Sequence, residues 1–195
     1  MAGMVNYLYG GDPRRSVKQY LAAMFQASGH RFSWDYAWVA EADGEAAGCL
    51  FSYPGQLIGR LQWAFLRSLP ALYGLGATVR IVVRSLPLYG TKETEADEYY
   101  ISNISIRPHL QGRGIGAQLI LFAEQKALQA GLSKCSLTVD EGNPGALRLY
   151  QRLGYKIVSS QRFNGEVAGH ESGYHRLVKT LDACIPENQL LETAH

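Results

Sequence analysis

The apolar positions in the first third of the chain change from a helical period to a strand period. Residues 14–28 carry apolar side chains three or four positions apart, which predicts an amphipathic helix closed by Gly29. Residues 38–53 contain two short apolar runs around Asp43-Gly44, a dipeptide typical of tight hairpin turns. We therefore expect a helix followed by a β-hairpin.

Residues 56–90 are rich in apolar and aromatic side chains, but proline and glycine interrupt them. This pattern predicts an inserted helical segment with breaks at Pro70, Gly74, Gly76 and Pro87. Arginines also interrupt the segment, so no uncharged run is long enough to cross a bilayer. Residues 1–13 show no clear strand before the first predicted helix. Either Val5–Tyr9 makes a very short edge strand at the start of the sheet, or no strand precedes the helix.

The second half of the chain alternates strand and helix patterns. Strand spacing is found in residues 100–106, 134–140, 155–163 and 175–181, and helical spacing in residues 114–130 and 143–153. Asn143-Pro144 suits a helix start, and Gly131 and Gly154 suit helix ends. We expect the last two strands to pair as a hairpin and residues 182–195 to form a tail.

The strand at residues 100–106 has an irregular period. Ile104 and Ile106 share a face, whereas Ile101 falls on the opposite parity. A β-bulge near Ser102–Asn103 would bring all three onto one face. A strand buried on both faces would need no bulge, so periodicity alone leaves both interpretations open.

A glycine-rich turn, Gln111-Gly-Arg-Gly-Ile-Gly116, lies between that strand and the next helix. Its three glycines remove the Cβ atoms that would keep an anion away from the backbone. The first turn of the helix presents unpaired N–H groups and the positive end of the helix dipole. Arg113 adds a cation beside them. The turn therefore predicts a site for a phosphorylated ligand.

Length and composition narrow the class of protein. The 195 residues suffice for one domain with a full core and are too few for two ordinary domains. A hydrophobic content of 47% and a charged content of 18% are typical of soluble globular proteins. The net charge of +2 is small, and no nucleic-acid-binding motif is present. We expect no nucleic-acid partner.

The cysteines bear on compartment and metal binding. Cys49, Cys135 and Cys184 are widely separated and odd in number, so they suit neither a metal site nor a disulfide framework. The N-terminus lacks the basic and apolar regions of a signal peptide. We expect no metal site and a cytoplasmic location.

Four features follow one another in the second half: a strand, the glycine turn with its helix, a second strand, and the run Asn143-Pro-Gly-Ala-Leu-Arg-Leu-Tyr-Gln-Arg-Leu-Gly-Tyr155. A glycine turn alone is common, but this combination resembles the GNAT superfamily of N-acetyltransferases, closely over about residues 99–160 and loosely over the hairpin. The resemblance implies an α/β (α+β) fold. It also implies a single domain over residues 1–181 that includes the helical insert at about residues 56–90. Its mixed, mostly antiparallel sheet would splay between two central strands, with helices on both faces. The resemblance also favours the bulge.

The resemblance implies that acetyl-CoA binds where the strands 100–106 and 134–140 splay apart. The pantetheine arm would pair with the backbone of Ile104, Ser105 and Ile106. The pyrophosphate would lie on the backbone N–H groups of Gln111, Gly112, Arg113, Gly114, Ile115 and Gly116. Asn143 either contacts the cofactor arm or serves only as a helix cap.

Acetyl transfer requires an amine with a free lone pair and a proton for the departing thiolate. The resemblance assigns that proton to Tyr150, whose alternative role is packing on an amphipathic helix. Glu98 is the first choice for the base, although it could equally be a solvated member of the acidic stretch at residues 93–98. Asn103 could instead position a water, and Glu141 is a third option. His109 is interpreted as structural or solvent-facing.

The acceptor is expected to be a small-molecule or peptide amine. No acidic residue lies between Ala46 and Lys92, whereas the insert carries Arg60, Arg67, Arg80 and Arg84. The insert either packs an extra helix on the core or covers the acceptor site. Arginines in such a lid would favour an acceptor with a carboxylate or phosphate. A homodimer is compatible with the sequence.

Two other classes of nucleotide-binding enzyme do not fit the glycine turn. The glycines are wrongly placed and spaced for a dinucleotide-binding enzyme, and no Gly-Lys-Ser/Thr follows them as in a P-loop. A non-catalytic acyl-CoA sensor on the same fold is the remaining alternative.

Overall fold

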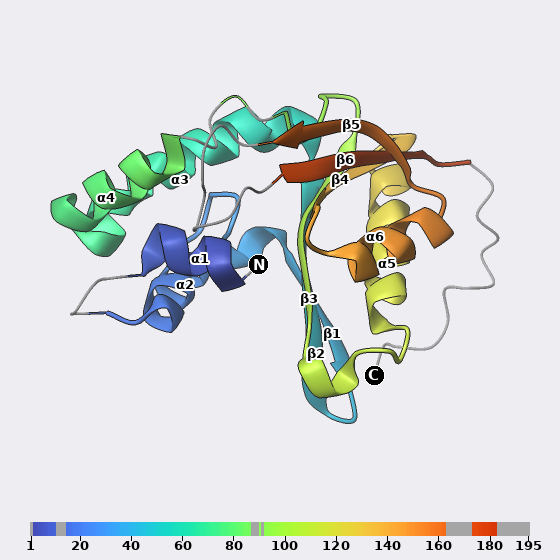
Figure 1. Ribbon diagram of the computed structural model, residues 1–195, viewed down its shortest axis with the longest axis horizontal. Helices are drawn as coiled ribbons and strands as arrows, with labels where there is room; N and C mark the ends of the chain where they lie inside the picture. The colour runs from blue at the N-terminus through green and yellow to red at the C-terminus, as the bar shows by residue number, and fades with distance from the viewer. Residues whose placement is uncertain (1, 11–14, 87–89, 91, 163–172, 183–195) are drawn as a thin grey trace.

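The computed structural model describes residues 2–10, 15–86, 90, 92–162 and 173–182. These residues form one open six-stranded sheet with helices on both faces (Figure 1). The strands are β1 (Ala37–Ala42), β2 (Glu45–Pro54), β3 (Tyr99–Ile106), β4 (Lys134–Asp140), β5 (Lys156–Arg162) and β6 (Gly173–Thr180). The longer helices are α1 (Ala2–Tyr9), α2 (Val17–Gln26), α3 (Ile58–Tyr73), α4 (Leu75–Ser85), α5 (Ile115–Gln129) and α6 (Pro144–Arg152).

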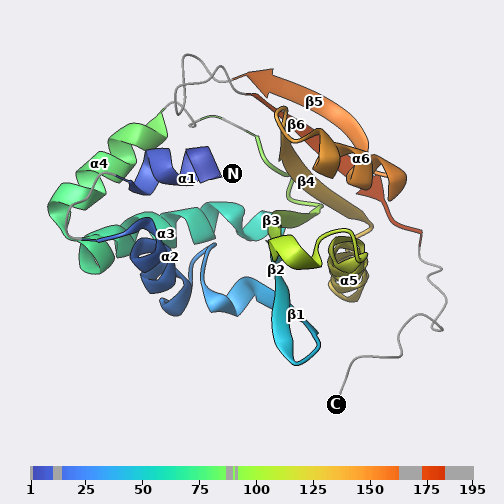
Figure 2. The ribbon, with the colours of Figure 1, turned by 60° about the horizontal axis from the view of Figure 1, so that its bottom comes forward.

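The helices form two separate layers, one on each face of the sheet (Figure 2). On one face, α5 and α6 bury Ile120, Ala123 and Tyr150 against the sheet in the main core. On the other face, α3 packs through Leu61 on Tyr100 of β3. Helices α1–α4 also share a small core of their own. The predicted fold class is confirmed, including helices on both faces.

The sheet splits between its two central strands. Its order is β1-β2-β3-β4-β6-β5, in which β3 and β4 run parallel and the other neighbours run antiparallel. β3 and β4 pair only over Tyr99–Ile101 and Cys135–Leu137. Beyond that point β3 stays with β2, and β4 stays with β6. Within the described residues, the edge of β3 that faces β4 therefore has no strand partner after Ile101.

A β-bulge lies at the point where the strands part. Phe51 of β2 pairs with Asn103, and the next residue, Ser52, pairs with Ile101, so Ser102 is the extra residue. The bulge resets the alternation of β3, and Ile101 and Ile104 both reach the core beneath α5. The bulged interpretation of the strand period is confirmed.

Most local signals of the sequence are confirmed. Asp43 and Gly44 take φ of 55° and 75° at the hairpin turn between β1 and β2. Asn143 caps α6 by accepting a hydrogen bond from the N–H of Ala146 at 3.1 Å, and Pro144 begins that helix. Strands β5 and β6 pair as expected. The expected tail at residues 182–195 lies outside the described residues after Asp182.

Three expectations about the N-terminal half need correction. The segment Val5–Tyr9 belongs to helix α1, so of the two alternatives left open there the short edge strand is wrong. Helix α2 ends at Gln26, before Gly29. In the insert, Pro70 lies inside α3, and only Gly74, with φ of 77°, separates α3 from α4. Pro70 has no backbone N–H, so α3 lacks one helical hydrogen bond there. Packing of the residues around Pro70 can offset the free energy lost with that bond. Pro87 lies outside the described residues.

Among the described residues, no helix combines the length and apolar character that crossing a membrane requires.

Candidate functional site

The glycine turn forms the N-terminal end of α5. Gly112 and Gly114 adopt positive φ of 81° and 83°, a backbone conformation that residues with a Cβ rarely take. The first helical hydrogen bond runs from the N–H of Gln118 to the carbonyl of Gly114 at 3.1 Å. The N–H groups of Ile115 and Gly116 precede it and point out of the helix end. The turn thus presents backbone donors and a positive dipole to whatever lies in front of it.

A cavity of about 520 Å³ lies in front of this turn. It is bounded by one side of β3, the glycine turn and one side of α6. Among the predicted cofactor residues, Ile104, Ile106, Gln111, Gly112, Gly114, Ile115, Gly116 and Asn143 line it, together with the predicted acid Tyr150. The structure therefore brings together residues from positions 104 to 150 around one cavity.

Two predicted cofactor residues do not line the cavity with their side chains. Ser105 is exposed and absent from its lining, and it pairs with Cys49 of β2. Arg113 lies 3.5 Å from Asp43 in the hairpin turn, and both side chains are largely exposed. Such an exposed pair is weak, so Arg113 is free to turn towards an anion at the glycine turn.

Tyr150 is buried in the wall of the cavity formed by α6. It is 6% exposed and packs in the main core, with its ring centroid 6.3 Å from that of Tyr155. Burial raises the pKa of Tyr150 to about 12. Its hydroxyl therefore stays protonated at neutral pH and can act as a proton donor.

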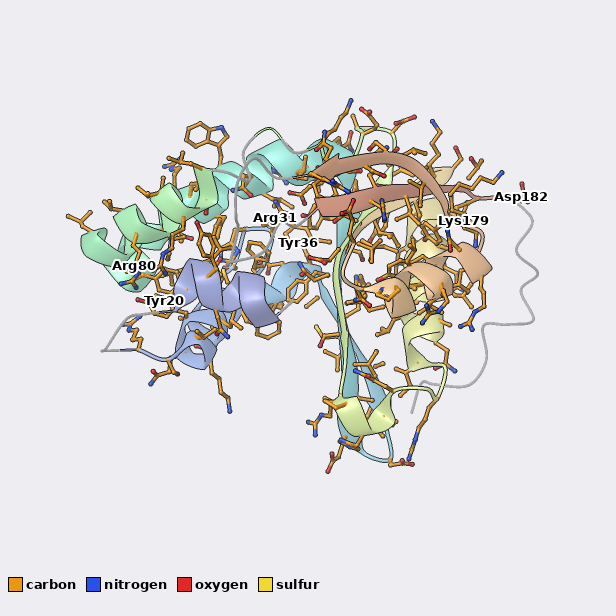
Figure 3. The ribbon with its side chains drawn as sticks, in the orientation of Figure 1. Tyr20, Arg31, Tyr36, Arg80, Lys179 and Asp182 are labelled. Carbon is orange, nitrogen blue, oxygen red and sulfur yellow. The ribbon has the colours of Figure 1, made fainter. Side chains whose placement is uncertain are left out.

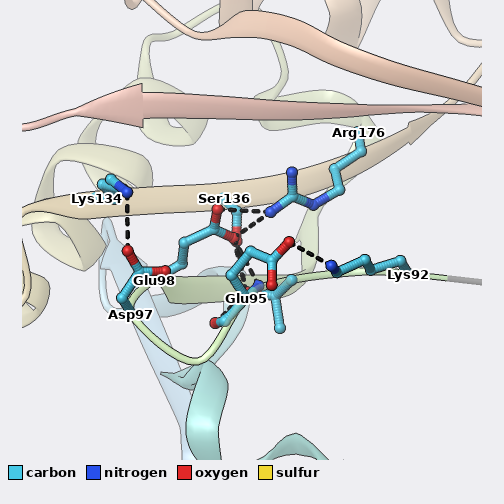
Figure 4. A network of polar contacts seen from close by, with 8 residues as sticks. Lys92, Glu95, Asp97, Glu98, Lys134, Ser136 and Arg176 are labelled. Atoms are coloured by element: carbon cyan, nitrogen blue, oxygen red, sulfur yellow. Dashed lines mark hydrogen bonds and ion pairs between the residues drawn. The ribbon is translucent and has the colours of Figure 1, made fainter.

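Glu98 is held in a buried ion pair. Its two carboxylate oxygens each lie 2.5 Å from Arg176 of β6, and the two residues are 3% and 7% exposed (Figure 4). The carboxylate also accepts hydrogen bonds from the hydroxyl of Thr94 at 3.0 Å and from the N–H of Glu95 at 2.9 Å. Burial alone would raise the pKa of Glu98, but these donors hold it below its usual value.

The other predicted acid–base residues occupy different surroundings. Asn103 follows the bulge, and its side-chain amide donates to the hydroxyl of Ser102 at 3.0 Å. Glu141 follows β4 and lies 3.9 Å from Arg162. His109 is exposed in the turn before the glycines. Of these residues, Asn103 lies nearest in the chain to the point where β3 and β4 part.

A second polar cluster was missed in the sequence. Arg31, in the loop after α2, binds Glu93 through both of its terminal nitrogens, at 3.1 and 2.5 Å. The hydroxyl of Tyr100 donates to Glu93 at 2.6 Å. Figure 3 shows Arg31 between the layer of helices α1–α4 and the sheet. Glu93 belongs to the acidic stretch at residues 93–98, for which a solvated position was one of two interpretations, and a pair separated by 62 positions leaves no local pattern in a sequence.

Comparison with known proteins places this arrangement among acetyltransferases. Residues 7–155 match the model of the Acetyltransferase (GNAT) family. The chain is 32% identical over 80 residues to a thialysine N-epsilon-acetyltransferase of Sus scrofa, covering 38% of this chain and 47% of that protein. It is 30% identical over 117 residues to a probable spermine N(1)-acetyltransferase of Bacillus subtilis subsp. natto, covering 58% and 62%. The chain thus spans about half the length of the first of these curated relatives.

A solved structure shows the same architecture. The N-acetyltransferase from Staphylococcus aureus Mu50 superposes with a TM-score of 0.56 at 25% identity, over 77% of this chain and 73% of that one.

Proposed function

Because the chain belongs to the Acetyltransferase (GNAT) family, we propose that it transfers an acetyl group from acetyl-CoA directly to a primary amine. The observation that carries this proposal is the cavity of about 520 Å³ at which the glycine turn, the parted strand β3 and Tyr150 meet. A phosphate site, a strand edge and a proton donor are the three things that such a transfer needs in one place.

The residues around this cavity fit acetyl-CoA. The N–H groups from Gln111 to Gly116 supply donors for a pyrophosphate, and Gly112 and Gly114 have no heavy atom within 4 Å of the place a Cβ would take. The edge of β3 that lost its strand partner after Ile101 can pair with the amide groups of the pantetheine arm through the backbone of Ile104, Ser105 and Ile106. Asn143 stands in the same wall while it caps α6.

Acetyl-CoA supplies the acetyl group as an activated thioester. Tyr150 is proposed to donate a proton to the departing thiolate, because its buried hydroxyl is neutral at physiological pH. Asn103, next to the bulge, is proposed to hold a water that removes the proton of the attacking amine. Glu98 remains the alternative base, but its ion pair with Arg176 and its lowered pKa favour a role in holding β3, β4 and β6 together.

The proposal is tested by following thiol release from acetyl-CoA with a panel of primary amines. We expect Tyr150→Phe to lower kcat by about 10²-fold, since general acid catalysis contributes that much or more. Binding of acetyl-CoA should persist, because the phenyl ring keeps its packing. Tyr7→Phe on α1, outside the cavity, serves as a matched control and should leave kcat unchanged.

The same assay separates the enzyme from a non-catalytic acyl-CoA sensor. Binding of acetyl-CoA with no amine-dependent thiol release across the panel would favour the sensor. An unchanged kcat in Tyr150→Phe would instead remove Tyr150 as the acid and leave the departing thiolate unassisted.

We also propose a cytoplasmic location, in which the thiols of Cys49 and Cys135 would remain reduced.

A further inference from the structure

A second cavity, of about 390 Å³, lies on the opposite face of the sheet from the first. It opens among α1, α3 and the segments that precede β1 and β3. Its walls are mostly apolar and include Tyr9 of α1, Phe65 of α3, and Phe32 from the loop after α2. Its polar side is formed by Arg31, Gln62 and Glu93. Nothing in the acetyl-CoA cavity overlaps with these residues. The second cavity is therefore a separate compartment within the described part of the chain.

The charges of this second cavity cancel. The guanidinium of Arg31 is saturated on one side by the Glu93 carboxylate and donates to the side-chain oxygen of Gln62 at 3.0 Å. The Arg31 and Glu93 side chains are 10% and 25% exposed, so the pair is shielded from water and Glu93 is its more open member. The polar side of the cavity is therefore an ion pair and a side-chain amide, and it carries no net charge.

The arginines of the helical insert do not change this balance. Arg60, Arg67, Arg80 and Arg84 are absent from the described lining of the cavity. Arg84 instead donates to the backbone carbonyls of Tyr7 and Gly10, each at 2.8 Å, and so ties α4 to α1. The expectation that insert arginines would select an anionic acceptor has no support in this geometry.

The polar side of the cavity reaches the point where the sheet splits. Glu93 accepts the hydroxyl of Tyr100, and that hydroxyl lies 3.4 Å from the hydroxyl of Thr138 on β4. Tyr100 immediately precedes Ile101, the last residue of β3 that pairs with β4. A molecule in the cavity thus has its polar end near the residues at which β3 and β4 part.

We propose that this cavity holds the acceptor, and that the acceptor is a primary amine whose remaining body is apolar or aromatic and carries no second charge. This inference rests on the proposed acetyl transfer. A carboxylate on the acceptor would find no free cation, because Glu93 already neutralises Arg31. A second ammonium would be desolvated against Tyr9, Phe32 and Phe65 with no free counter-charge, because Arg31 already neutralises Glu93, and this is costly. An apolar site also lowers the pKa of a single ammonium and so favours the free amine that attacks.

Gly59 provides a way to block the cavity without disturbing the core. It lies in α3, lines the cavity, and a Cβ built on it meets nothing within 4 Å. Gly59→Phe places a large side chain at the cavity while replacing glycine in a helix, which is tolerated or favourable. Gly76 of α4 is also exposed and unobstructed but does not line the cavity, so Gly76→Phe is the matched control.

The experiment compares three probes: 2-phenylethylamine, L-phenylalanine and 1,5-diaminopentane. Binding to the full chain is measured by calorimetry, and acetyl transfer by thiol release. We expect 2-phenylethylamine to exceed both other probes at least tenfold in affinity and in kcat/KM. Gly59→Phe should lower both quantities at least tenfold for 2-phenylethylamine and leave acetyl-CoA binding intact, whereas Gly76→Phe should change neither.

Preference for the amino acid or the diamine, or an unchanged affinity for 2-phenylethylamine in Gly59→Phe, would overturn the inference. The proposed function fails separately, if acetyl-CoA does not bind or if no amine is acetylated. Calorimetry of the amines decides on the acceptor cavity in either case, because it does not depend on transfer.

Discussion

At the scale of single residues, the glycine turn depends on backbone conformation more than on side chains. Gly114 has φ of 83° and immediately precedes the first residue of α5, so it sets the direction in which the helix begins. Its carbonyl accepts the first helical hydrogen bond, from Gln118. A residue with a Cβ would be strained there even though the surrounding space is open.

We predict that Gly114→Ala lowers the free energy of unfolding by about 1–2 kcal/mol, the cost of a left-handed conformation for an L-residue. It should also weaken acetyl-CoA binding, because the N–H groups of the turn move as the strain relaxes. Chemical denaturation and calorimetry measure the two effects. Gly131→Ala, at a φ of 74° beyond the other end of α5, is the control and should show the stability loss alone. Equal acetyl-CoA affinity in both variants would remove the turn from the binding site.

At the scale of secondary-structure elements, buried polar groups hold the parted strands in place. Glu98, just before β3, pairs with Arg176 of β6. The hydroxyl of Thr94 donates to Glu98 and also shares a hydrogen bond of 2.8 Å with Ser136 of β4. Three elements are thereby joined on the side of the sheet where main-chain pairing between β3 and β4 is short. These contacts favour a fixed angle between the two halves of the sheet.

We predict that Arg176→Met lowers the free energy of unfolding by roughly 3–5 kcal/mol, because it leaves the Glu98 carboxylate buried without a counter-charge. Urea denaturation measures the loss. Lys134→Met removes another long cation of this region, which pairs with Asp97 at 2.8 Å, but that pair is exposed and its loss should be small. Similar losses in the two variants would contradict the difference in burial on which this prediction rests.

At the scale of the whole molecule, the pH dependence of stability is the sum of the contributions of all groups whose pKa is shifted by folding. His30 is 1% exposed and packs edge-on against Phe65, and its Nδ1 accepts the N–H of Phe32 at 3.2 Å. Burial lowers the pKa of His30 below its ordinary value, although Asp35 opposes the shift. The pKa values of Glu93 and Glu98 are also lowered. All three groups bind more protons in the unfolded chain than in the folded one at acid pH.

We predict that stability falls as the pH drops below about 6.5, where an unfolded histidine gains its proton and the buried neutral His30 does not. A second loss should follow below about pH 4.5, where unfolded Glu93 and Glu98 gain protons. Urea midpoints measured from pH 7.5 to 5.5 isolate the histidine. His30→Gln should flatten that part of the profile, and His109→Gln, in the exposed turn, should not. A flat profile in the unmodified protein would contradict a buried neutral His30.

Much of the cavity proposed for acetyl-CoA was predictable because its determinants are local. Glycines that must take positive φ, the Asn143-Pro144 helix start and the shift of period in β3 each act within a few residues. They also follow one another in a fixed order along the chain. The same reasoning left Val5–Tyr9 open as a strand and misjudged Pro70, where helix packing outweighs local preference.

The sequence by itself determined most of the order of strands and helices, the glycine turn and the residues that surround it, because backbone conformation and periodicity are encoded over short stretches. Only the tertiary structure decided that Glu98 pairs with Arg176, 78 positions away, and that Arg31 and Glu93 form the neutral side of a second cavity. Such contacts depend on which distant segments the fold brings together. The charge and the burial that result from that pairing set the pKa of each group and the chemistry of each cavity.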